Sequence, residues 1–96
     1  MAFDTWELGT DIDLLGEWAN IDGENQDPDT IALDLTEPDG TVTSWVKADL
    51  TQDVVGKWYR VHTTAQVGLH TFTFTAIGSG TQVVKTGYFR VVDLTP

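Results

Sequence analysis

The sequence predicts an all-β protein, an antiparallel β-sandwich of about seven strands. Three observations lead to this prediction. Apolar and polar residues alternate over several segments, turn-forming residues recur about every ten residues, and no segment carries a sustained helical period flanked by caps. Fifteen threonines and frequent valine, isoleucine and aromatic residues favour strands as well. We therefore expect almost no helix.

The first half of the chain shows two clear alternating segments. Residues 10–20 place Ile12, Leu14 and Trp18 on one side and acidic residues on the other, as in a half-buried strand. A polar stretch follows and is expected to be an exposed loop. The next strand is expected over 31–35, where Ile31, Leu33 and Leu35 alternate with more polar residues.

Turn chemistry organises the middle of the chain. Residues 37–40 read Glu-Pro-Asp-Gly, which places proline and glycine where a tight hairpin turn prefers them. We expect the return strand over 41–48, a polar connection over 49–53, and a further strand over 54–64.

That strand carries aromatic and β-branched residues in both phases. We expect Tyr59 and Val61 to be buried, which leaves the opposite, exposed side for Trp58, Arg60 and His62.

The last two strands are expected over 69–76 and 81–93, joined by a hairpin at 78–80. Their inward residues are expected to be Phe72, Phe74, Ala76, Phe89 and Val91. Short strands at this spacing favour an immunoglobulin-like sandwich, and a small barrel of five or six strands is the alternative. We expect one domain over 1–96, with residues 1–8 an N-terminal arm or an edge strand.

Composition narrows the classes of function. The net charge is −10, and residues 1–46 hold twelve acids and no lysine or arginine. This balance argues against binding to nucleic acids or anionic membranes, both of which favour a basic face. No cysteine is present, so neither disulfides nor thiolate chemistry is expected. The chain has no apolar run long enough to span a membrane and no signal-peptide pattern.

Several short motifs follow one another along nearly the whole chain. They are Asp22-Gly23, Asp27-Pro28-Asp29-Thr30, Pro38-Asp39-Gly40-Thr41, Gly56-Lys57-Trp58-Tyr59, Gly68-Leu69-His70-Thr71-Phe72 and Gly87-Tyr88-Phe89-Arg90-Val91. In this order the chain resembles the small immunoglobulin-like domains of tailed-bacteriophage structural proteins. The resemblance implies a virion protein, most simply a decoration or cement protein that binds the major capsid protein or another virion protein.

Two other functions remain open at this point. One is a connector-associated or tail-associated protein of the same fold, and the other is a carbohydrate-binding or cell-surface module. The initial Met, the missing export signal and the end of the chain soon after the last strand lead us to expect a complete gene product located in the virion. A homo-oligomer would fit such a role, although no residue pattern requires one.

An acidic loop is a candidate calcium site. Asp22, Glu24, Asp27 and Asp29 lie within eight residues, but they do not match an EF-hand, and a solvated loop is the preferred interpretation. Otherwise no cofactor is expected. His62 and His70 lack ligand spacing and are expected at the surface.

No catalytic motif is present, so we expect a binding protein rather than an enzyme. Four tryptophans exceed the needs of a small core, and large aromatic side chains often anchor interfaces. The expected partner-binding residues are Trp58, Arg60, His62, Trp45 and Trp6.

Overall fold

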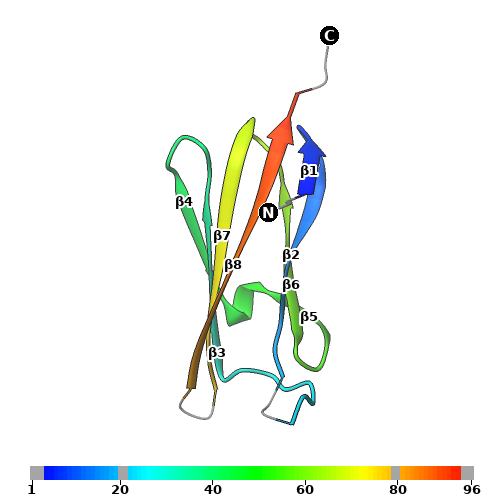
Figure 1. The fold of residues 1–96 in the computed structure, drawn as a ribbon, viewed down its shortest axis with the longest axis vertical. Coiled ribbons are helices and arrows are strands. Elements are labelled where there is room, and N and C mark those ends of the chain that lie inside the picture. The colour runs from blue at the N-terminus through cyan, green and yellow to red at the C-terminus, as the bar shows by residue number, and fades with distance from the viewer. Residues whose placement is uncertain (1–3, 20–21, 79–80, 94–96) are drawn as a thin grey trace.

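Two β-sheets packed face to face form this protein (Figure 1). The computed structural model describes residues 4–19, 22–78 and 81–93. The strands are β1 (Asp4–Glu7), β2 (Asp11–Glu17), β3 (Thr30–Thr36), β4 (Val42–Val46), β5 (Thr51–Val54), β6 (Lys57–Thr63), β7 (Gly68–Gly78) and β8 (Thr81–Val92). A single 3₁₀ turn, η1 (Lys47–Asp49), connects β4 to β5. The expectation of almost no helix is confirmed for these residues.

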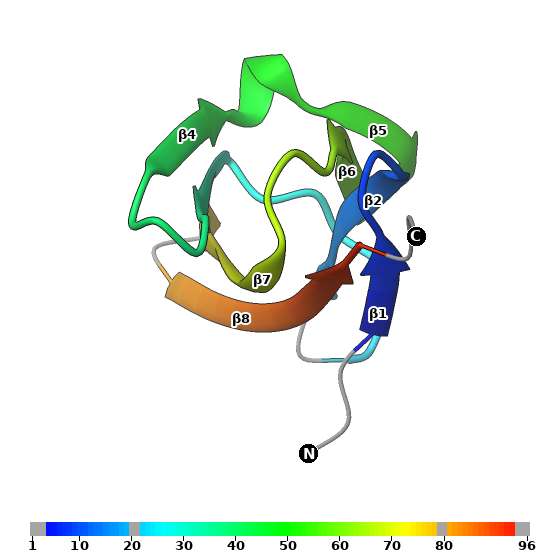
Figure 2. The ribbon, with the colours of Figure 1, turned by 90° about the horizontal axis from the view of Figure 1, so that it is seen from above.

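The strand order is that of an immunoglobulin-like sandwich. The larger sheet has the order β1-β8-β7-β3-β4 and the smaller one β2-β6-β5. Pairing is antiparallel throughout these strands except between β1 and β8, which run parallel. Figure 2, along the strands, shows the two sheets curving around one core, with η1 closing the side between β4 and β5. The predicted sandwich is confirmed, with eight strands instead of about seven.

The core lies between the two inner sheet faces. Its buried apolar residues are Ile12, Leu14, Trp18, Ile31, Leu33, Leu35, Leu50, Phe74, Ala76, Phe89 and Val91. The alternation predicted in β2, β3, β7 and β8 is therefore confirmed, and Phe72 is partly buried against the same cluster. Burial of this apolar surface is the main contribution to the stability of a chain without disulfides.

The hairpin between β3 and β4 forms at the turn predicted over residues 37–40. Gly40 adopts a left-handed φ of 92°, which favours glycine, and its N–H donates to the Glu37 carbonyl at 2.9 Å. The Asp39 carboxylate accepts the Thr41 N–H at 2.9 Å, and this bond holds the pKa of Asp39 below its ordinary value.

One connection was predicted wrongly. Residues 49–53 were expected to be a polar connection, but Thr51–Val54 forms strand β5, which pairs with β6 through a bulge between Gln52 and Val54. All four residues of β5 are exposed, so the alternation that reveals a half-buried strand is missing there. Within the described part of the chain, no helix is long and apolar enough to cross a membrane.

Candidate interaction surface

The outer face of the five-stranded sheet has few charged residues among those that the structure describes. At its centre, β7 directs Thr71, Thr73 and Thr75 outward, because the intervening Phe72 and Phe74 face the core. At the two ends of the same row, Leu69 and Ile77 are exposed. The centre of the face is thus rich in threonine, with apolar residues at its borders.

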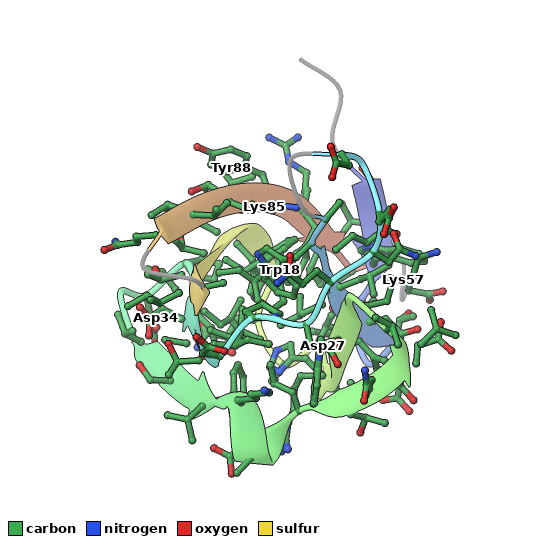
Figure 3. All side chains as sticks on the ribbon, turned by 90° about the horizontal axis from the view of Figure 1, so that it is seen from below. Trp18, Asp27, Asp34, Lys57, Lys85 and Tyr88 are labelled. Carbon is green, nitrogen blue, oxygen red and sulfur yellow. The ribbon has the colours of Figure 1, made fainter. Side chains whose placement is uncertain are left out.

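The neighbouring strands extend this apolar character. In β4 the exposed Val42 and Val46 lie on the outer face, and in β8 Val84 and Tyr88 do. More than half of the surface of each of these valines is exposed. Figure 3 shows the labelled Tyr88 pointing away from the sandwich. We call this whole surface, on the outer side of β1, β8, β7, β3 and β4, the neutral face.

Few charges interrupt the neutral face. By strand alternation, only Glu7, Asp34 and Arg90 among the described residues of its strands belong to it. Asp34 accepts a hydrogen bond from the Ser44 hydroxyl at 2.6 Å, so part of its charge is satisfied within the sheet. In a chain of net charge −10, a surface with two acids and one arginine is a strong local exception.

A shallow hollow of about 380 Å³ opens at one end of the neutral face. It lies between β3, the end of β4, η1 and β7, and its lining is mainly apolar, including Ala32, Val46 and Ile77. Such a hollow accommodates a protruding apolar side chain, the usual form of an interface anchor.

The predicted binding patch of Trp58, Arg60 and His62 is not on an exposed face. Antiparallel pairing places these residues opposite Gly16, Leu14 and Ile12 of β2, all of them buried. Their side chains therefore face the interior, where Trp58 packs against the core. The exposed phase of β6 instead includes Val61, which is 49% exposed, and Tyr59 is only half-buried.

The inward and outward sides predicted for β6 are exchanged in the structure. The prediction was wrong because the residues on each side of this strand combine apolar and polar atoms. What decides the phase is the pairing with β2. Once Ile12 and Leu14 are buried, the residues directly opposite them must face the same way.

Trp45, another of the expected partner-binding residues, is packed against the core from β4. The guanidinium of Arg60 lies 5.3 Å from the Trp45 ring centroid, and the ammonium of Lys47 lies 5.2 Å from that of Trp58. These cation–π contacts close the flank of the sandwich between β4 and β5. Trp45 and Trp58 thus have a structural role. Trp6, in edge strand β1, is 37% exposed.

The acidic loop is tied to the fold through Asp27. Its carboxylate accepts the Gly56 N–H at 2.7 Å, the Trp58 indole N–H at 3.1 Å and the Gln52 amide at 2.9 Å. The bond from Gly56, with smaller contributions from the other donors, holds the pKa of Asp27 below its ordinary value. In the described parts of the chain, no group of three acidic or histidine side chains is arranged to hold a metal ion.

The two histidines are not surface residues, contrary to prediction. His70 is fully buried and stacks on Phe89 with ring centroids 4.6 Å apart. The side chain of His62 is 16% exposed, with Nε2 3.8 Å from a Glu37 carboxylate oxygen. Burial lowers the pKa of His62, and the nearby Glu37 opposes this effect only in part. The alternation that correctly placed Phe72 and Phe74 inward also places His70 inward, so this signal was present in the sequence.

Sequence reasoning did not identify the neutral face as a site. The outward direction of the β7 threonines follows from the inward side expected for Phe72 and Phe74, but no prediction placed the valines of β4 and β8 on an outer face. Only the sheet order brings them together. No known family model matches the chain, and a comparison with curated proteins finds no match.

Proposed function

We propose that this protein is a binding module of the virion of a tailed bacteriophage, a decoration protein that docks on the capsid shell through its neutral face. The neutral face is the observation that carries the binding part of the proposal. The virion part is supported by the resemblance of the sequence motifs to immunoglobulin-like domains of phage structural proteins.

The chemistry of the neutral face suits docking on a protein. Interface cores are depleted of charged residues and enriched in apolar ones, as this face is, whereas the acids gathered elsewhere keep the free protein soluble. Five strands spaced about 4.8 Å apart give the face a width of roughly 20 Å. The hollow beside Val46 would receive an apolar anchor from the shell.

The carbohydrate-binding alternative depended on exposed tryptophans. Since Trp45 and Trp58 are packed against the core and covered by cations, they do not offer a free ring face for stacking on a sugar. No observation in the described residues favours that alternative, and we do not propose it.

The test is quantitative mass spectrometry of purified virus particles from the source, with this chain measured against the major capsid protein. Hundreds of copies per particle are expected for a decoration protein. A few to a few dozen copies would instead favour a connector-associated or tail-associated protein. Absence from particles, together with no binding of the purified protein to isolated shells, would overturn it.

A further inference from the structure

Strand β4 is an edge strand without the usual protection against pairing. The described strands that border a sheet are β1, β2, β4 and β5. Three of them contain acidic residues, and β5 also has a bulge, features that discourage strand addition. In contrast, β4 reads Val-Thr-Ser-Trp-Val, with no charge, proline or glycine. It lies at the outer border of the larger sheet in Figure 1.

The backbone groups on the open side of β4 can be identified from the register. Near the hairpin, the Glu37 N–H donates to the Thr41 carbonyl at 2.9 Å, which defines a hydrogen-bonded pair. Because such pairs alternate along an antiparallel ladder, Thr43 and Trp45 direct their N–H and C=O groups toward β3. The corresponding groups of Val42, Ser44 and Val46 are directed to the open side.

One end of this open edge is already occupied. The Val46 N–H donates to the Asp49 carboxylate of η1 at 3.0 Å, in agreement with its outward direction. At the other end, the chain enters the hairpin turn at Gly40. The complete donor and acceptor pairs left on the open side are therefore those of Val42 and Ser44.

We propose that β4 pairs with β4 of a second copy, antiparallel and with the two-fold axis at Thr43. In this register Val42 of each copy faces Ser44 of the other, and the two pairs form four backbone hydrogen bonds. An axis at Ser44 would instead need the Val46 N–H, which Asp49 occupies. The two larger sheets become one continuous sheet of ten strands, since each contributes five.

Charge favours this edge over the others for self-association. Pairing β2 with itself would bring its acidic residues close to those of the partner copy, whereas β4 brings only uncharged side chains into opposition. The remaining repulsion is that between two chains of net charge −10. Added salt screens it, so dimerisation is expected to strengthen as ionic strength rises. The inference does not depend on the proposed function.

A single-cysteine experiment tests the register, because the native chain has no cysteine. In the proposed dimer, Thr43 opposes Thr43 in a non-hydrogen-bonded pair, where Cβ atoms lie about 4.5 to 5.5 Å apart, close to disulfide distance. Thr43→Cys is expected to form a disulfide-linked dimer at least ten times faster under mild oxidation than Thr51→Cys, a matched control on the exposed edge β5. Faster cross-linking of Ser44→Cys than of Thr43→Cys would overturn the proposed axis.

Sedimentation tests the association itself. The native protein is expected to show a concentration-dependent monomer–dimer equilibrium that shifts toward dimer between 50 mM and 500 mM NaCl. Ser44→Pro removes one outward N–H and leaves the ladder to β3 intact, so it is expected to give a folded monomer by circular dichroism. A native protein that stays monomeric at millimolar concentration and high salt would overturn the proposal, as would unchanged dimerisation in a folded Ser44→Pro variant.

Discussion

The two outer faces of the sandwich contrast sharply, although both enclose the same core. The smaller sheet directs Asp11, Asp13 and Glu17 of β2 outward, and Glu17 lies 3.9 Å from the ammonium of Lys57 on β6. The larger sheet presents threonine and valine over most of its area. Both sheets have one buried and one exposed face, so the demands of folding alone do not explain the difference. The proposed docking through the neutral face rests on this difference.

The largest effect is expected from charging the neutral face. Val84→Lys places an ammonium on β8 where the proposed contact excludes water, and an unpaired charge there should weaken shell binding roughly 100-fold, about 2.7 kcal/mol. The measurement is cosedimentation with isolated shells.

Val61→Lys is the matched control, because Val61 is similarly exposed on the outer face of the smaller sheet. It should change shell binding less than about threefold, in line with a residue outside the interface. Equal losses in the two variants would remove the distinction between the faces.

The next largest effect is expected on the free energy of unfolding, where a glycine on the inner side of each sheet makes room for an aromatic ring. A methyl group at Gly16 would overlap the buried Trp18 ring, and one at Gly87 would overlap the half-buried Phe72 ring. Gly16→Ala should reduce the free energy of unfolding by about 2 to 3 kcal/mol, the upper range for overpacking, measured by urea denaturation.

Gly87→Ala should cost less, about 1 kcal/mol, because Phe72 is only partly buried and can move toward solvent. Since Gly87 lies on the inner side of the larger sheet, shell binding at saturating folded protein should be unchanged. A greater loss for Gly87→Ala than for Gly16→Ala would contradict this ranking.

A smaller effect concerns pH. Burial lowers the pKa of His62 in the folded protein below the ordinary value of 6.5, so the unfolded chain binds more protons just below that pH. Stability should therefore fall as pH decreases from about 7 toward 5. His62→Gln should flatten this part of the profile, measured by thermal melts.

Asp39→Asn provides the control for the pH experiment. The pKa of Asp39 is lowered from 3.8, so its stabilising contribution is present above that value and is lost only at lower pH. The slope between pH 7 and 5 should stay as in the native protein. Loss of the slope in Asp39→Asn with retention in His62→Gln would refute the assignment to His62.

The smallest changes in stability are expected from replacing one acidic residue on each outer face. Asp13→Asn on the smaller sheet should alter stability by less than about 0.5 kcal/mol, as is usual for an exposed residue. Asp34→Asn weakens the bond from Ser44 and should cost slightly more, about 0.5 to 1 kcal/mol. Chemical denaturation measures both, and a larger loss for Asp13→Asn would contradict the difference.

Part of the fold was predictable because single segments encode it. In β2 and β3, apolar residues occupy one phase and polar residues the other, so Leu14 and Leu33 could be placed inside. The hairpin at residues 37–40 was equally local, because proline and glycine determine a turn from within it.

The site was predicted less well because it depends on residues distant in sequence. Trp58 was assigned to an exposed face because it shares its side of the strand with Arg60 and His62, yet a strand with mixed polarity has two plausible phases. Trp45 was expected to bind a partner because large aromatic side chains often anchor interfaces, and it too packs against the core. The sequence around Arg60 and His62 does not indicate which strand pairs with them. The edge character of β4 likewise depends on which strands pair elsewhere.

The sequence by itself determined that this chain is an all-β sandwich, where its clearest strands and turns lie, and which residues form most of the core. Those features follow from alternation and turn chemistry within a few residues. Only the tertiary structure decided which strands share a sheet, which phase of β6 faces inward, and that the larger sheet has a neutral outer face and an unprotected edge. The physical reason is that sheet neighbours are selected by burial and hydrogen bonding between segments far apart in the chain, so no single segment specifies them.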